Sequence, residues 1–300
     1  MENNKSGKTL KILLILTLAI IIIFGGIYLF KKSNIKLGKN IKVKNPEITF
    51  NTNMGSFTAE LYPKKAPNTV KNILALASSG YYNGKIIYGK DMVTMHLGRK
   101  TNGLQEDPTL SNIRNDIKKG SEEDIKYSIK GEFTNNNFKQ NDLPHERYTL
   151  SIARPDYTKV LKNLKEQSYN AGCGNILIVL RGGERLNGNY AAFGKIIKGQ
   201  DVVDNIEKLK LQYLDKMEKK IKEEKNEKKK EEMKKAFANQ LLALNGFENP
   251  PVIKSVDIDT KGIEYNTPEY IKAFNIEEYL ADKYKQDNKT QIRRGNVKWK

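Results

Sequence analysis

An unbroken apolar segment, ILLILTLAIIIIFGGIYLF, occupies residues 12–30 near the start of the chain. A helix of this length spans about 28 Å, close to the thickness of a bilayer's hydrocarbon core. Lysines flank the segment on both sides, and no small-x-small cleavage site follows it. The pattern predicts an uncleaved signal anchor that crosses the membrane once. A cleaved signal peptide and a buried core helix are the alternatives.

Flanking charge does not decide the orientation of this segment, because lysines lie on both sides of it. A short tail before a signal anchor usually stays in the cytoplasm while the longer remainder is exported. We therefore expect a cytoplasmic tail at 1–11, a linker at 31–44, and a globular part outside the cytoplasm. The expected location is the cell membrane, with a single pass through it.

Beyond the linker, short alternating segments separated by Gly- and Asn-containing turns predict a mainly β domain. Residues 47–61 are typical of a hairpin that turns at 53–55. A helix is expected from Pro67 to Gly80, where apolar residues recur every three or four positions. Further strands are expected at 85–88, 92–97, 148–153, 175–180, 191–197 and 252–258. Many short strands with glycine turns favour a barrel or a sandwich.

From Asp201 onward the apolar spacing changes to that of an amphipathic helix, which ends at 245–246. Residues 207–235 hold 12 lysines and 8 acidic residues, a net charge of only about +4. Mixed charge at helical spacing predicts one long solvated helix or a helical hairpin. A surface for a helical or anionic partner through 201–245 is the alternative.

Composition excludes several classes of function. The net charge of +18 is spread along the whole chain without a phosphate loop, zinc-finger spacing or ribonucleoprotein signature, so we expect no nucleic-acid partner. One cysteine excludes a disulfide framework, and two histidines leave little room for a histidine-rich metal site. We expect no cofactor and no metal.

Six segments, in order, resemble the cyclophilin-type peptidyl-prolyl isomerases. They are GSFTAEL with APNTVKN (55–61 and 66–72), GYYNG (80–84), GEF (131–133), HERYTLSIAR (145–154), LNGNYAAFG (186–194) and QDVVDNI (200–206). The resemblance covers about residues 45–260. Together with the predicted anchor at 12–30, it favours a divergent, membrane-anchored bacterial member of the family.

The resemblance implies a closed, eight-stranded antiparallel barrel with capping helices. It places this domain at 45–262, with a long Lys/Glu-rich helical insertion at about 207–248. Residues 263–300 are then a C-terminal extension.

The resemblance also implies chemistry without a nucleophile. Rotation about an X-Pro bond crosses a barrier of about 20 kcal/mol, and a donor aimed at the prolyl nitrogen lowers it by stabilising the twisted amide. In the family that donor is an arginine just after the GYYDG turn, and here its position reads Gly89. Lys90 follows, and on a regular strand it faces the opposite side. A bulge at Gly89 would return it, so Lys90 is the candidate catalytic residue.

The other groove residues follow from the same resemblance. Asn175 stands where the family has a substrate-binding glutamine, while Ala153 and Arg154 match its backbone-binding pair. The remaining residues would form the proline pocket, and they are Met95, Leu177, Leu186 and Tyr190. On alternating strands, the three aliphatic ones could instead belong to the barrel core.

The resemblance therefore implies a peptidyl-prolyl isomerase that assists folding outside the cytoplasm and binds proline-containing segments of exported proteins. Catalysis is expected to be weak or lost, because the family arginine is absent. The alternative is a non-catalytic binding or scaffolding module that uses the same groove.

Overall fold

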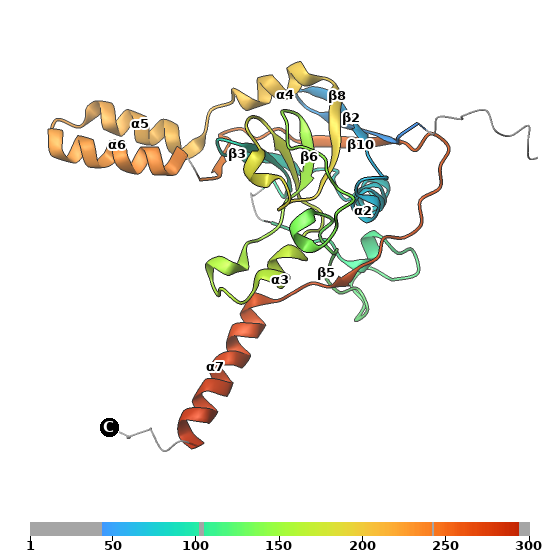
Figure 1. The fold of residues 1–300 in the computed structure, drawn as a ribbon. Helices are drawn as coiled ribbons and strands as arrows, with labels where there is room; N and C mark the ends of the chain where they lie inside the picture. The colour runs from blue at the N-terminus through green and yellow to red at the C-terminus, as the bar shows by residue number, and fades with distance from the viewer. Residues whose placement is uncertain (1–43, 102–104, 242, 294–300) are drawn as a thin grey trace, which may run out of the picture. The chain divides into compact units, whose positions relative to one another are not determined.

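A computed structural model describes residues 44–101, 105–241 and 243–293 (Figure 1). Residues from Asn45 onward form one compact unit, and only this unit is considered below. The predicted anchor at 12–30 and the tail before it lie outside the described residues. Among the helices that are described, none is both long and apolar enough to cross a membrane.

Nine antiparallel strands form the main sheet, in the order β10-β1-β2-β8-β6-β7-β4-β3-β9. Their bounds are β1 Glu47–Thr52, β2 Gly55–Leu61, β3 Ile86–Lys90, β4 Thr94–Arg99, β6 Thr149–Ile152, β7 Ile176–Val179, β8 Ala192–Lys198, β9 Asn245–Gly246 and β10 Ile253–Asp259. Every strand expected from the alternation is confirmed to within two residues at each end. The two-residue β9 was not expected, nor was a second small sheet of β5 Tyr127–Ser128 and β11 Ile271–Lys272.

The sheet thus has nine strands where eight were expected. Backbone hydrogen bonds also join the start of β3 to the start of β10: Ile87 N donates to Pro251 O (2.9 Å) and Ile253 N to Lys85 O (2.8 Å). They lie at the margins of the strand ladders, so a fully closed barrel remains a prediction.

Six α-helices lie within the described residues: α2 Pro67–Ser78, α3 Lys165–Tyr169, α4 Gln200–Glu207, α5 Gln212–Glu223, α6 Glu227–Leu241 and α7 Ile276–Arg293. The amphipathic segment after Asp201 is therefore three helices, of which α5 and α6 contact each other as a hairpin. Ion pairs between lysines and glutamates three to five positions apart line this hairpin. Such exposed pairs contribute little stability each, as expected for a solvated face.

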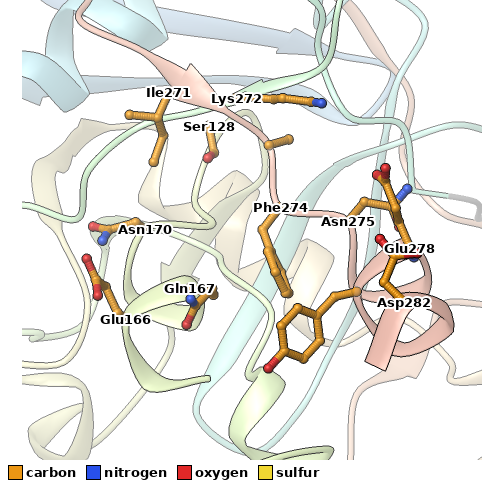
Figure 2. A pocket seen from close by; sticks show the side chains of 12 residues that line it. Ser128, Glu166, Gln167, Asn170, Ile271, Lys272, Phe274, Asn275, Glu278 and Asp282 are labelled. Atoms are coloured by element: carbon orange, nitrogen blue, oxygen red, sulfur yellow. The ribbon is translucent and has the colours of Figure 1, made fainter. Parts of the chain in front are cut away.

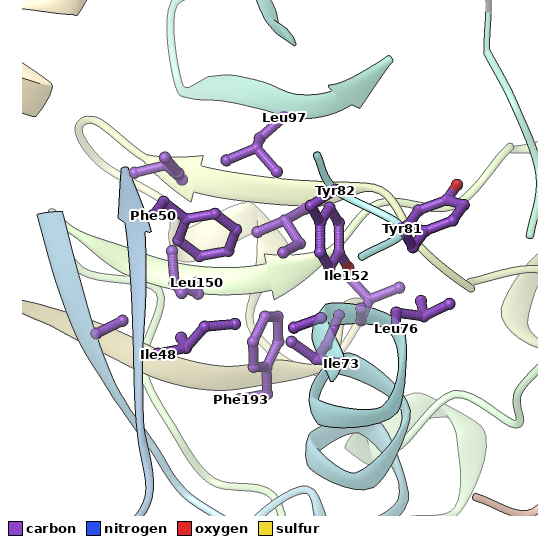
Figure 3. Close-up of a cluster of buried hydrophobic side chains, with 14 of the residues drawn as sticks. Ile48, Phe50, Ile73, Leu76, Tyr81, Tyr82, Leu97, Leu150, Ile152 and Phe193 are labelled. Carbon is purple, nitrogen blue, oxygen red and sulfur yellow. The ribbon is translucent and has the colours of Figure 1, made fainter. Parts of the chain in front are cut away.

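The core lies between the sheet and α2 (Figure 3). Phe50 stacks on Phe57 at 5.2 Å between ring centroids, and Ile73 from α2 is fully buried in the same cluster. The first turn of α2 is capped from a distance, because Ala66 has no side chain that can cap it. Buried Glu132 accepts the amide hydrogens of Asn68 (2.9 Å) and Thr69 (2.7 Å) instead.

After β10 the chain continues as residues 263–275, here called the C-terminal strap. Asn68 at the start of α2 exchanges two hydrogen bonds with the backbone of Glu269 in the strap (2.8 and 2.7 Å). Arg114 donates to the Tyr270 hydroxyl (2.9 Å), and β11 pairs with β5. The strap therefore ties the 105–128 segment to the helix that covers the sheet.

Candidate functional site

One cavity of about 420 Å³ collects three of the residues expected to form a groove, Ala153, Arg154 and Asn175. We call it the groove cavity. It lies where β4, β6 and β7 end, and loop residues close its sides: Gln105, Asp107, Pro155, Lys159, Ala171, Cys173, Gly174 and Leu244. His96, Leu97 and Arg99 of β4 complete the lining.

Arg154 is the most constrained cation of this cavity. Its guanidinium carbon lies 4.6 Å from the ring centroid of Tyr190, 4.9 Å from Tyr169 and 5.5 Å from Phe133. Nη2 donates to Asn189 O (3.0 Å), and burial lowers the pKa of the guanidinium. Arginine stays protonated under all ordinary conditions, so Arg154 brings to the wall of the cavity a fixed positive charge that has lost part of its water.

Asn175 supplies an unused acceptor. Its backbone carbonyl accepts from Ala153 N (2.9 Å), which joins the ends of β6 and β7. Its side-chain Oδ1 is buried and has no hydrogen-bond partner among the described residues. A buried acceptor without a partner costs about 1–3 kcal/mol, so a bound N–H group would recover free energy here.

Two residues that line the groove cavity, Arg99 and His96, were not predicted from the sequence. Arg99 stacks on Tyr88, with its guanidinium carbon 4.1 Å from the ring centroid. His96 accepts or donates a hydrogen bond with Thr94 Oγ1 (3.1 Å) and lies 3.7 Å from the Asp91 carboxylate. The alternation in β4 could have indicated His96, because it leaves this residue half-buried while its two neighbours in the strand are buried.

Met95 lies away from the groove cavity, and its place in a proline pocket stays a prediction. It is fully buried in the core cluster and pairs with Ile178, which is also in that cluster. Met95 is not among the residues that line the groove cavity. The burial of Met95 agrees with the alternative that the aliphatic residues belong to the barrel core.

Leu177, Leu186 and Tyr190 also lie outside the lining of the groove cavity. Leu177 is nearly buried and pairs with His96 and with Ser151 across the sheet. Leu186 ends a short 3₁₀ helix, Glu184–Leu186, and is half-buried. Tyr190 reaches the cavity only indirectly, by stacking on Arg154.

Lys90 also lies away from the groove cavity, and its catalytic role stays a prediction. The anticipated irregularity in β3 is present, with register shifts on both sides of Ile87. The Lys90 amine nevertheless donates to the backbone oxygen of Glu207 at the end of α4. Burial lowers the pKa of Lys90, and the charge of Glu207 opposes that shift. Lys90 does not line the groove cavity, because its amine is held at α4.

Comparison with known proteins then identifies the family. Residues 47–228 match the family described as cyclophilin type peptidyl-prolyl cis-trans isomerase/CLD. The chain belongs to this family. The cyclophilin match includes the groove cavity's strands and stops before β10.

The chain is also similar to individual peptidyl-prolyl cis-trans isomerases and to a solved cyclophilin structure. A peptidyl-prolyl cis-trans isomerase of Acinetobacter baylyi is 30% identical over 165 residues, which is 54% of this chain and 72% of the relative. Peptidyl-prolyl cis-trans isomerase B of Escherichia coli is 28% identical over 160 residues, 53% of this chain and 82% of the relative. A cyclophilin structure from Cryptosporidium parvum aligns with 72% of this chain and 98% of its own, at 18% identity and a TM-score of 0.48.

Gly89 stands where the resemblance implies an arginine, and the structure gives a physical reason for glycine at this position. A Cβ atom on Gly89 would lie 1.9 Å from the backbone oxygen of Asn245. Asn245 belongs to β9, which pairs with β3 at this residue. No side chain fits at position 89 while β9 is in place, so β9 and an arginine at position 89 exclude each other.

Proposed function

We propose that this cyclophilin binds extended, proline-containing segments of exported proteins in the groove cavity and isomerises X-Pro bonds weakly. The observation that carries the proposal is the unpartnered, buried Oδ1 of Asn175 in the same cavity as Arg154. Together they offer an acceptor for a peptide N–H and a fixed cation for a peptide carbonyl or prolyl nitrogen. An extended peptide backbone presents N–H donors and carbonyl acceptors, and this pair can bind both.

Arg154 is the proposed donor in the reaction. The uncatalysed X-Pro rotation takes about 10–100 s, and only groups that favour the twisted amide over the planar one speed it up. A guanidinium that three aromatic rings already hold in place needs little reorganisation to donate to that amide. Part of its capacity is used on the carbonyls of Asn189 and Ser168, which supports a weak rather than an efficient catalyst.

A non-catalytic binding module is the second candidate. It is favoured by Gly89, which removes the donor that the family places on β3, and by Lys90, whose amine is held at α4. Binding would still use Asn175 and the backbone at Ala153. Residues 12–30 would hold either kind of domain at the outer face of the cell membrane.

Exchange spectroscopy on an X-Pro peptide, with the full chain in detergent micelles, tests the proposal. We expect accelerated cis–trans exchange that Arg154→Lys lowers at least about tenfold, because an ammonium lacks the planar fork. The control Lys90→Ala should keep the wild-type rate. Circular dichroism must show that both variants are folded.

Two other outcomes carry different meanings. Peptide binding without acceleration, weakened about fivefold by Asn175→Ala through loss of about 1 kcal/mol, would establish the binding module. If the folded chain neither binds nor accelerates, both candidate functions fail.

A further inference from the structure

A second cavity, of about 470 Å³, lies apart from the groove cavity and shares no lining residue with it. Three distant parts of the chain build it: β5, α3, and the C-terminal strap with the first turns of α7 (Figure 2). We call it the strap cavity. It exists only because the strap returns to β5 through the β11 pairing.

The strap cavity is acidic in a chain whose net charge is +18. Glu166 comes from α3, and Glu278 and Asp282 come from successive turns of α7. Lys272 is the one cationic residue in the lining. Carboxylates from two separate elements therefore line one cavity from opposite sides, against the charge of the molecule as a whole.

Two buried polar atoms of this cavity have no partner among the described residues, Ser128 Oγ and Gln167 Oε1. Ser128 is 3% exposed, and Figure 2 shows its hydroxyl directed into the space between Ile271 and Phe274. Each such atom costs about 1–3 kcal/mol when unpaired. Both can accept a hydrogen bond, so an N–H donor in the cavity would offset that cost.

The walls of the cavity are aromatic. Phe274 lies 5.5 Å from Tyr279 and 5.2 Å from Tyr157, between ring centroids. Aromatic faces attract cations and also cover the alkyl stem of a long basic side chain. A metal ion is a poorer match, because the described residues contain no group of three or more His, Cys, Asp or Glu side chains able to hold one.

We propose that the strap cavity binds the guanidinium group of an arginine side chain on a partner peptide. A guanidinium has five N–H donors in one plane, so it can pair with carboxylates at the rim and also reach buried acceptors. An ammonium would satisfy fewer of them. This site is independent of proline recognition, and its proposal stands or falls apart from the groove.

The probe is a fluorescein-labelled peptide, acetyl-Ala-Ala-Arg-Ala-Ala, titrated with the full chain in detergent micelles and followed by fluorescence anisotropy. Its match is the same peptide with citrulline, which has a similar shape and no charge. We expect the arginine peptide to bind at least about tenfold more tightly, a difference of about 1.4 kcal/mol. Equal binding of the two peptides would overturn the proposal.

Variants locate the site. Glu278→Gln should weaken arginine-peptide binding about fivefold, while Glu277→Gln, the adjacent carboxylate on the same helix and outside the lining, should leave it unchanged. Asn175→Ala, in the groove, should also leave it unchanged. Equal effects of the Glu277 and Glu278 changes would refute the site.

Ser128→Ala separates binding from structure. Removing an unpartnered buried hydroxyl should keep or raise the melting temperature, because a desolvated polar group is lost. The same change should weaken the arginine peptide about two- to fivefold. A loss of stability without a loss of binding would show that Ser128 serves the fold alone.

Discussion

His145 links the stability of the domain to pH through a single buried side chain. Its Nδ1 lies 3.0 Å from Asn187 Oδ1 and its Nε2 lies 3.0 Å from Ser151 Oγ. Burial lowers the pKa of His145 below its ordinary value of 6.5, and the hydrogen bond with Asn187 opposes this shift. In the unfolded chain the imidazole takes up its proton at a higher pH than in the folded chain.

We expect the folded state to lose stability as pH falls from about 7.5 to 5.5, since protons bind the unfolded chain more tightly. His145→Gln should remove this part of the pH dependence and cost about 1 kcal/mol at pH 7.5, one net hydrogen bond. Urea denaturation of both proteins at several pH values measures it. Identical pH slopes would contradict the assignment.

At this scale, part of the site was predictable. Ala153, Arg154 and Asn175 lie just outside strand ends, where matching a motif is enough to place a residue in space. The three residues share one cavity. Met95 and Lys90 lie inside strands and do not line that cavity. For Lys90, the register shifts earlier in β3 make the face hard to predict, because one extra residue reverses it. Arg99 lines the same cavity but could not be found by motif, because it lies outside the six segments that carry the resemblance.

Among the elements, β9 has the largest effect for its size. It is two residues long, yet it pairs with β3, and its neighbour Phe247 donates its N–H to Tyr88 O (2.9 Å). These contacts return the chain from the α5–α6 hairpin to the sheet. The hairpin itself was predictable from helical spacing, whereas two residues of strand carry too little pattern to be recognised.

Gly89→Ala should detach β9 from β3, because the added Cβ would clash with the backbone oxygen of Asn245, which moves only if the strand moves. We expect a loss of about 1–3 kcal/mol, typical of overpacking, and faster hydrogen exchange of the Phe247 amide. Gly246→Ala is the milder comparison, since its Cβ would meet Tyr88 side-chain atoms at 3.2 Å. Equal effects of the two changes would rule out close backbone approach as the cause.

For the whole molecule, the C-terminal strap connects segments that lie outside the main sheet. The sheet runs from β10 to β9 without it, and the strap contacts α2, β5 and the 155–170 segment. Sequence reasoning found the sheet because alternation and glycine turns are local signals. It could not place the strap, because Asn68 and Glu269 are far apart in sequence and their pairing leaves no periodic pattern.

A chain ending at Gly262 should keep its sheet but lose about 2–4 kcal/mol, from the two Asn68 bonds and the β5–β11 pair at about 1 kcal/mol each. Hydrogen exchange should rise at 126–129 and stay slow in β1 and β2. Asn68→Ala should reproduce about half of the loss. Unfolding of the entire sheet on truncation would show that the strap is part of the core.

The close approach of Gly89 and Asn245 also sets the order in which this scaffold can be redesigned. An arginine at position 89 has no space beside the strand at 245–246, so restoring it by one substitution would displace that strand. An engineer who wants an efficient isomerase from this scaffold must remove residues 245–246 first and only then restore the arginine.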